Sequence, residues 1–374
     1  MSSELIESVE SIIVDVPIKR VHKFSATSIT TQAILLIRIR TRNGVVGIGE
    51  STTPGGPWWL GESVESMKLM IDSYFSPALI GSDALQIPEV LRKLNKIAAL
   101  NSFAKAGIEM ALFDIKGKVF NAPLHQLLGG LARESVKTCW PLAIGDIDRD
   151  VAEAEHLLSE NLAQEFKIKM GYREPKEDVA FACSLASALL SRGATVRVDI
   201  NQAWDEGTAH RWLPVMIDAG VSVIEQPVQG WNHEAMARIT GKYSAQVLAD
   251  ESVCTLQDAL KIGSLRFADA FALKAMKSGG ILAAQKIAGI AEAAGVPCFA
   301  GCFLEASIGS SAMVSLACAL PNATYGSEQI GPIWLKEEIV EDPVEIRDNR
   351  IWVKHGPGLG VTLSEEKLQR FRRR

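Results

Sequence analysis

Two lysines, Lys167 and Lys169, are the first residues whose type and spacing suggest chemistry. They lie two positions apart in the apolar run 165–170, and the alternation of a β-strand points both side chains to the same face. Burying two like charges on one face costs free energy unless opposite charges lie nearby. We therefore expect carboxylates close to both lysines.

Three later strand-like segments end in a carboxylate, and a fourth ends in a lysine. These residues are Asp199, Glu225, Asp250 and Lys274. Counted from Lys169, the successive charges are 30, 26, 25 and 24 residues apart, which is the length of one strand and one helix each time. The charge always falls at the carboxyl end of its strand. This regularity predicts a shared site.

Carboxylates on three consecutive strand ends form an all-oxygen site of the kind that Mg²⁺ or Mn²⁺ prefers. No histidine or cysteine lies among Asp199, Glu225 and Asp250, which disfavours zinc. A single aspartate at a strand end is more often a helix cap or an ion-pair partner. Three in register favour a metal site.

Lysines flank the carboxylates in the sequence, with Lys167 and Lys169 before them and Lys274 after them. A closed barrel would therefore place lysines on opposite sides of the metal. We expect burial and neighbouring cations to lower the lysine pKa values, so that a proton can be exchanged near neutral pH. A carboxylate substrate between the lysines would then be set up for proton transfer at its α-carbon. The alternative is a structural set of ion pairs.

The elements that lead up to this site form an α+β region. Strands are predicted at 4–16, where Pro17 follows, and at 32–40 and 45–48, with an Asn-Gly hairpin turn between the last two. Helical periodicity then dominates 63–128. The Gly/Pro-rich loop between these parts carries two adjacent tryptophans. Such a loop either packs on its own domain or closes over a ligand.

From residue 136 strands and helices alternate, which predicts a parallel (β/α) barrel in place of the alternative, a doubly wound open sheet. The barrel explains the recurring charges better, because it brings all its strand ends to one mouth. The expected strands are 136–141, 165–170, 195–200, 221–226, 246–250, 269–274, 297–301 and 323–327. The expected organisation is a capping domain (1–130), a modified TIM barrel (131–345) and a C-terminal segment (346–374) that returns to the cap with a strand at 350–353 and a short basic helix at 364–374.

The composition excludes several classes of partner. A formal net charge of −5 over 374 residues gives no basic footprint for nucleic acid or anionic lipid. No signal peptide is visible, and the most apolar late stretch, 306–320, is too short and serine-rich to span a bilayer. Six scattered cysteines have neither zinc nor redox spacing. We expect a cytoplasmic protein that binds neither nucleic acid nor membranes.

Five motifs at the strand ends carry a resemblance to a known family. They are 167–171 (KIKMG), 198–202 (VDINQ), 224–227 (IEQP), 249–252 (ADES) and 273–280 (LKAMKSGG). Together they resemble the enolase superfamily, whose sites pair a Lys or His base with Mg²⁺, and most closely its muconate lactonizing (cycloisomerase) subgroup. Further matches extend the resemblance nearly end to end, at 47–50, 101–105, 127–130, 325–332, 336–340 and 357–360.

The resemblance implies a role for each strand-end charge. The implied metal ligands, for Mn²⁺ or Mg²⁺, are Asp199, Glu225 and Asp250. The implied catalytic residues are Lys169 as the acid/base that protonates an enolate, Lys167 as its electrostatic neighbour, Lys274 as the lysine on the opposite face, and Glu328 as a carboxylate at the eighth strand end. No organic cofactor is implied.

The implied reaction is the intramolecular lactonisation of cis,cis-muconate, a small dicarboxylate from catechol breakdown, to muconolactone. Chloromuconate is the alternative substrate, and N-succinylamino acid racemase or o-succinylbenzoate synthase is a rival on the same scaffold. Dipeptide epimerases and mandelate-racemase-like enzymes are disfavoured, because the Asp-x-Asp and the late histidine that they use are missing. A non-catalytic binding protein would have lost a lysine or a ligand. The resemblance also implies a homo-oligomer, possibly an octamer.

The sequence departs from the family pattern at positions that we expect to face the distal end of the substrate. Cys302 and Ala306 stand where relatives tend to have Thr and Gly, and the loop at 51–60 is bulkier than in several relatives. These departures leave muconate against chloromuconate open. The expected substrate-binding residues are Pro54, Trp58, Trp59, Asn201, Cys302 and Leu304.

Overall fold

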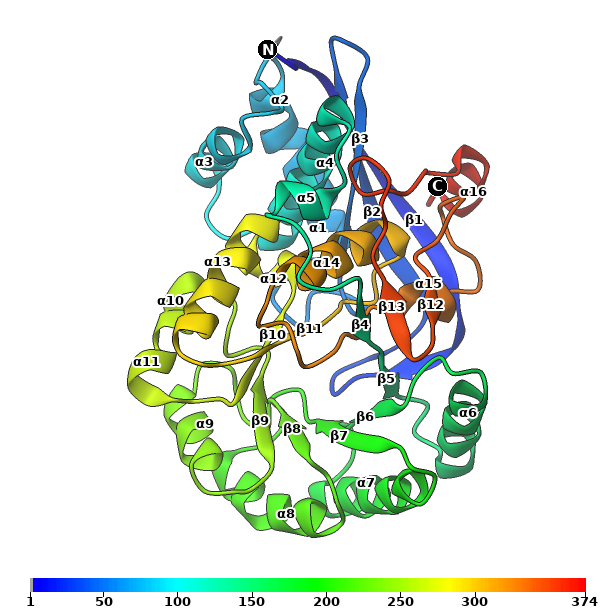
Figure 1. Cartoon of the computed structure of the whole chain (residues 1–374), viewed down its shortest axis with the longest axis vertical. Helices are drawn as coiled ribbons and strands as arrows, with labels where there is room; N and C mark the ends of the chain where they lie inside the picture. Colours follow the sequence, from blue (N-terminus) through cyan, green and yellow to red (C-terminus); the bar gives the residue numbers. More distant parts are fainter. Residues whose placement is uncertain (1–2) are drawn as a thin grey trace.

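The computed structural model describes residues 3–374. Figure 1 shows two parts stacked along the long axis, a helix-covered antiparallel sheet above a ring of parallel strands and outer helices. We call these parts the cap and the barrel. They are packed through a shared hydrophobic core, in which Phe103 of the cap lies 4.9 Å, between ring centroids, from Phe303 of the barrel.

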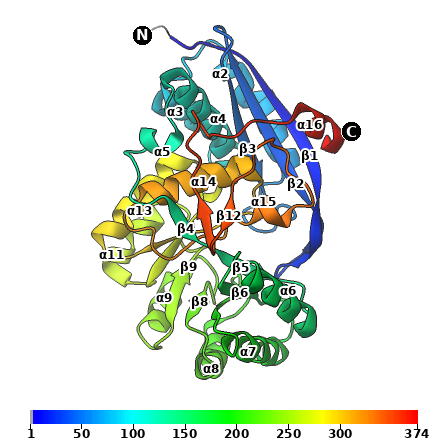
Figure 2. The ribbon, with the colours of Figure 1, turned by 45° about the vertical axis from the view of Figure 1, so that its right-hand side comes forward.

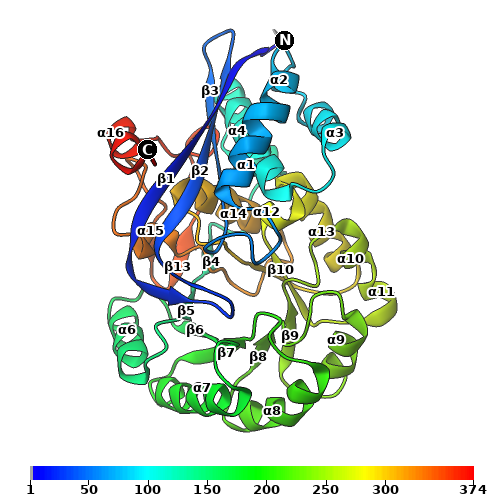
Figure 3. The same ribbon diagram turned by 180° about the vertical axis from the view of Figure 1, so that it is seen from behind.

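The cap sheet is built from three long antiparallel strands in the order β1-β2-β3. They are β1 (Ile6–Lys23), β2 (Ser28–Thr41) and β3 (Val46–Thr52). The predicted end of the first strand at residue 16 was wrong, because β1 continues past Pro17 with a register shift between Pro17 and His22. An edge strand tolerates a proline, which cannot donate a ladder hydrogen bond. The β1–β2 hairpin therefore reaches down to β5 of the barrel (Figure 3).

The cap helices follow where helical periodicity predicted them. The longest, α4 (Ser102–Phe120), is buried on nearly every side because it lies between the cap sheet and the barrel. Glycines permit this close packing: a Cβ at Gly49 would lie 2.0 Å from the carbonyl oxygen of Gly107. The others are α1 (Val64–Met70), the π-helical turn η1 (Ile71–Phe75), α2 (Ser76–Leu79), α3 (Ile87–Ile97) and α5 (Leu124–Leu127).

The barrel contains a parallel sheet of seven strands in sequence order. These are β5 (Cys139–Leu142), β6 (Glu165–Lys169), β7 (Thr195–Asp199), β8 (Val223–Glu225), β9 (Gln246–Ala249), β10 (Ala270–Leu273) and β11 (Cys298–Ala300). Their helices are α6 (Ile147–Ser159), α7 (Pro175–Leu190), α8 (Glu206–Asp218), α9 (His233–Thr240), α10 (Leu256–Leu260), α11 (Ile262–Leu265), α12 (Ala275–Ser278), α13 (Ile281–Ala293) and α14 (Ser307–Ala319).

The predicted eighth strand at 323–327 was wrong. Within the described residues this segment makes only isolated bridges, from Ser327 to Thr138 on one side and to Ala300 on the other. Gly326 has a φ of +84°, which is outside the strand region. The ring is therefore closed by a loop, and Glu328 follows directly on the closing residue.

The chain ends partly against the barrel and partly against the cap. The short helix α15 (Gly331–Trp334) comes first. A small antiparallel sheet follows, in which β13 (Arg350–Trp352) lies between β12 (Ile346–Arg347) and β4 (Ser135–Lys137). The last helix, α16 (Glu365–Phe371), is shorter than the predicted 364–374 and lies beside β1 (Figure 2). No helix within residues 3–374 is long and apolar enough to cross a membrane.

Candidate active site

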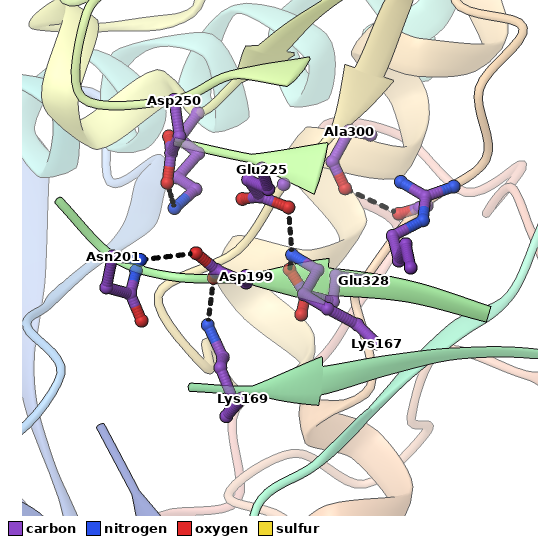
Figure 4. Close-up of polar contacts among 12 residues, drawn as sticks. Lys167, Lys169, Asp199, Asn201, Glu225, Asp250, Ala300 and Glu328 are labelled. Atoms are coloured by element: carbon purple, nitrogen blue, oxygen red, sulfur yellow. Dashed lines mark hydrogen bonds and ion pairs between the residues drawn. The ribbon is translucent and has the colours of Figure 1, made fainter. Parts of the chain in front are cut away.

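The two lysines of β6 lie inside the barrel with carboxylates around them, as the strand alternation predicted (Figure 4). Lys169 pairs with Asp199, its direct neighbour across the parallel ladder, at 2.5 Å between Nζ and Oδ2. Lys167 has no exposed side-chain surface and lies between two glutamates. Its Nζ is 2.7 Å from Glu225 Oε2 and 2.6 Å from Glu328 Oε2.

A second group of charges surrounds Asp250, just after β9. Lys274 Nζ lies 2.5 Å from one carboxylate oxygen of Asp250, and Lys277 Nζ lies 2.7 Å from the other. Lys277 also donates to the backbone carbonyl of Asp250 at 2.6 Å. Asp199 and Glu225 are directly paired in the ladder, so the three carboxylates come from three adjacent strand ends.

The expectation that the lysine pKa values are lowered was wrong for the residues as they lie. Burial lowers the pKa of Lys169, but attraction to Asp199, together with Glu328 and Glu225, outweighs it, and the net shift is upward. The pKa of Lys274 is also raised, because Asp250 and Glu225 outweigh the effect of burial. The sequence showed the lysines near one another but not how closely a carboxylate contacts each one.

The carboxyl groups show the complementary effects. Burial, followed by repulsion from Asp199, raises the pKa of Glu225 to about 7. Burial also raises the pKa of Glu251 to about 8, with a further contribution from Asp250. At Asp250 burial acts in the same direction, but Lys274 and Lys277 outweigh it and lower the pKa. Asp250 therefore retains its negative charge more readily than Glu225 and Glu251 do.

The chemistry of the three strand-end carboxylates fits a hard divalent cation. All the donors are oxygens, and Glu225 Oε1 is buried without a hydrogen-bond partner among the described residues, whereas Oε2 is paired with Lys167. In their present rotamers, Asp199 and Asp250 point toward ammonium groups, and nowhere in residues 3–374 do three acidic, His or Cys side chains converge as a ready-made metal site. The donor atoms are thus of the type that a divalent cation prefers. The side chains of Asp199 and Asp250, however, are oriented toward lysine ammonium groups.

A small cavity opens beside these charges and is lined by both the cap and the barrel. Five of the six predicted substrate-binding residues line it: Pro54, Trp59, Asn201, Cys302 and Leu304. Trp58 is not among the lining residues. Its ring packs 5.7 Å from Phe24, between centroids, and its indole N–H donates to the carbonyl of Pro54 at 2.6 Å. Trp58 therefore stabilises the loop that carries Pro54 and Trp59.

Two family models match the chain, and between them they span most of it. Residues 8–129 match the mandelate racemase/muconate lactonizing enzyme N-terminal domain, and residues 149–367 match the enolase C-terminal domain-like family. Muconate cycloisomerase 1 of Pseudomonas putida is 43% identical over 100% of both chains. The chain belongs to the muconate lactonizing enzyme subgroup of the enolase superfamily.

Other members of the subgroup are similar over nearly the whole chain. A chloromuconate cycloisomerase of Cupriavidus pinatubonensis (strain JMP 134 / LMG 1197) is 43% identical over 96% of this chain and 97% of its own. The crystal structure of the Pseudomonas fluorescens muconate lactonizing enzyme complexed with muconolactone superimposes with a TM-score of 0.96, at 40% identity over 100% of both chains. Enzymes of the superfamily use a divalent metal ion.

Three residues at this enolase-superfamily site were not predicted. Lys277 could have been found, because it lies one helical turn after Lys274. Glu251 follows Asp250 directly, and its Oε1 accepts a hydrogen bond from Asn201 Nδ2 at 3.4 Å. His22 lines the cavity from the far end of β1. No local pattern marks it, because only the tertiary packing brings β1 to the barrel.

Proposed function

We propose that this protein is a muconate cycloisomerase, which converts cis,cis-muconate to muconolactone. One observation carries the proposal: Lys169 and Lys274 line the same cavity from strands on either side of the three strand-end carboxylates. A dicarboxylate held there has an ammonium group on each side. This is the arrangement required for proton transfer to a carbon next to a carboxylate.

The reaction balances without any further reagent. One carboxylate oxygen of muconate bonds to the alkene carbon that closes the five-membered ring, and the electron pair moves toward the second carboxylate. Lys169 Nζ then delivers a proton to the carbon next to that second carboxylate, and solvent later restores the proton to the lysine. The dianion gains one proton and becomes the lactone monoanion.

The surrounding residues prepare this proton transfer. Lys167 lies between Glu225 and Glu328 and adds positive charge beside Lys169. Lys274 stabilises negative charge from the opposite side, within 4.5 Å of the Phe303 ring centroid and 4.9 Å of that of Trp59. A divalent cation, when held by Asp199, Glu225 and Asp250, supplies electrostatic stabilisation of the substrate carboxylate. We propose Mn²⁺ or Mg²⁺, because every donor is an oxygen.

The proposal also covers the molecule as a whole. We propose the boundaries 1–130, 131–345 and 346–374 for the cap, the barrel and the returning segment, which the packing of α16 on β1 supports.

We propose a homo-oligomer, supported by exposed apolar side chains on the cap such as Leu69 and Tyr74. All six cysteines are free, which supports a cytoplasmic location. Light scattering tests the oligomer.

The decisive experiment mixes the purified protein with Mn²⁺ and cis,cis-muconate and follows loss of the diene's ultraviolet absorbance. We expect metal-dependent loss that Lys169→Ala abolishes and that Lys176→Ala, at an exposed site on α7, leaves unchanged. Repeating the assay with 2- and 3-chloromuconate ranks the substrates. If no muconate is consumed while the metal is bound, the proposal is wrong, and racemisation of N-acylamino acids becomes the reaction to test.

A further inference from the structure

One buried histidine of the cap faces the catalytic cavity. His22 lies near the end of β1, has no exposed surface, and lines the cavity together with Lys169, Lys274 and Glu328. Its ring is packed between Phe24, at 4.7 Å between centroids, and Trp334, at 5.4 Å. Side chains on both sides therefore fix the orientation of the ring.

The contact of His22 with Arg20 determines which ring nitrogen carries the proton. Arg20 Nη1 lies 3.0 Å from His22 Nδ1, and a guanidinium can only donate. Nδ1 must therefore accept, which leaves the hydrogen on Nε2. Arg20 is itself fixed, because its Nε contacts Glu153 Oε1 of α6 at 2.8 Å and its Nη2 donates to the carbonyl of Pro141 at 2.7 Å.

The ring is also neutral. Burial, then repulsion from Arg20, Lys169 and Lys167, lowers its pKa well below the usual value. His22 therefore presents one N–H donor at Nε2 and carries no charge. Within the described residues this Nε2 is buried and has no hydrogen-bond partner. A buried donor left unsatisfied costs free energy, so a partner is expected when the cavity is filled.

Three other nitrogen-bearing side chains that line the cavity each donate a hydrogen bond within the protein. Lys169 donates to Asp199, and Lys274 donates to Asp250, each at 2.5 Å. Asn201 Nδ2 donates to Glu251. Among the described lining side chains, His22 contributes a buried nitrogen donor with no hydrogen-bond partner within the protein. The indole N–H of Trp59, which also lines the cavity, makes no hydrogen bond within the described residues either.

We propose that the Nε2–H of His22 binds one carboxylate of the dicarboxylate substrate and so selects diacids over monoacids. The inference rests on the proposed function, which supplies a substrate with two carboxylates. One carboxylate lies with the strand-end cluster. The other is held by the cap, through a hydrogen bond from a neutral donor to a charged acceptor. His22 is thus a substrate-binding residue, and the Arg20–Glu153 pair is its positioning device.

The test compares binding of adipate, an unreactive saturated six-carbon dicarboxylate, with binding of hexanoate, its monocarboxylate counterpart. The proteins are the wild type, His22→Phe, which keeps an aromatic ring, His22→Gln, which keeps an N–H donor, and His156→Phe, at an exposed site on α6. Calorimetry gives each Kd in the presence of Mn²⁺, and circular dichroism checks each fold. Muconate turnover of the wild type is measured in parallel.

We expect the wild type and His156→Phe to prefer adipate, and His22→Phe to lose about 10- to 100-fold of that preference, as expected for one hydrogen bond to a charged group. His22→Gln should retain part of it. With muconate, His22→Phe should raise KM more than it lowers kcat. Equal preference in the wild type and a folded His22→Phe would overturn the inference, as would a wild type that binds both acids equally. Binding of adipate does not depend on turnover. If the wild type prefers adipate but does not convert muconate, only the proposed function is wrong, and the inference about His22 stands.

Discussion

Lys274 and Lys277 contact the same carboxylate, one on each oxygen of Asp250, at 2.5 and 2.7 Å. Both lysines come from the short segment where β10 ends and α12 begins. The charge on Asp250 is therefore compensated twice, whereas Glu225 has one ammonium neighbour and a raised pKa. The two lysines differ in position, because Lys274 lines the cavity and Lys277 lies behind the carboxylate.

Replacing Lys277 should make the stability of the protein more dependent on bound metal. Lys277→Met removes one of two cations from a buried carboxylate, and breaking a buried ion pair costs up to about 3–5 kcal/mol. The thermal midpoint of the chelated protein should fall by several degrees, and Mn²⁺ should restore more stability to the variant than to the wild type. Lys261→Met, at a surface pair with a 3.7 Å separation, should change neither quantity. An equal response to Mn²⁺ in all three proteins would contradict the prediction.

Neutralising a proposed metal ligand should weaken metal use without unfolding the protein. Asp199→Asn keeps the shape of the side chain but removes one negative charge from the all-oxygen cluster. The Mn²⁺ concentration for half-maximal activity should rise by about tenfold or more, as expected for loss of a charge-based ligand. The control is Asp205→Asn, a helix N-cap of α8 where either residue serves. An unchanged metal requirement in Asp199→Asn would remove this residue from the ligand set.

A single methyl group should displace the second lysine. A Cβ at position 301 would lie 2.7 Å from Cε and 3.1 Å from Cγ of Lys274. That side chain is flexible, so Gly301→Ala should cost little stability, but the ammonium group must move. We expect kcat to fall by about 10- to 100-fold, which is typical of a displacement of about 1 Å. Gly289→Ala on α13, where nothing lies within 4 Å, is the control. Full activity in Gly301→Ala would show that the position of Lys274 is not critical.

The interface between the cap and the barrel should respond to pH through Glu109. Its carboxylate accepts from the backbone N–H groups of Ile281 and Leu282 at the start of α13, and burial raises its pKa to about 8. The folded state keeps a proton that the unfolded state releases above pH 4.5, so stability falls as the pH rises from about 4.5 to about 8.

The thermal midpoints of the wild type and Glu109→Gln, measured between pH 5 and pH 8, check this sign. Because glutamine does not titrate, the variant should gain stability relative to the wild type as the pH rises, by at most about 1.4 kcal/mol per pH unit. Glu177→Gln, at an exposed site, should follow the wild type. Parallel curves for all three proteins would exclude Glu109 as a source of the dependence.

Six barrel strands, β6 to β11, and the charges Lys167, Lys169, Asp199, Glu225, Asp250 and Lys274 were predictable, because strand alternation and the repeat length are local properties of the sequence. The first predicted strand, 136–141, is divided between β4 and β5, and Glu328 came only from the family resemblance. Lys169 and Asp199 are 30 residues apart, yet the ladder pairs them directly. The loop at Ser327 was not predictable, since its residues suit a strand and the positive φ of Gly326 appears only in the folded backbone. His22 was missed for another reason. Its role depends on Pro141 and Glu153, which are more than 110 residues away in the sequence.

The mixed lining of the cavity has a thermodynamic consequence. His22 and Trp59 come from the cap, whereas Lys169 and Lys274 come from the barrel, so a ligand that contacts both sets bridges the two parts. Binding of such a ligand and packing of the cap on the barrel are thermodynamically linked. The ligand stabilises the packing by the same free energy by which the packing increases the affinity for the ligand. Substitutions at that interface, far from any reacting atom, will therefore appear as changes in ligand affinity.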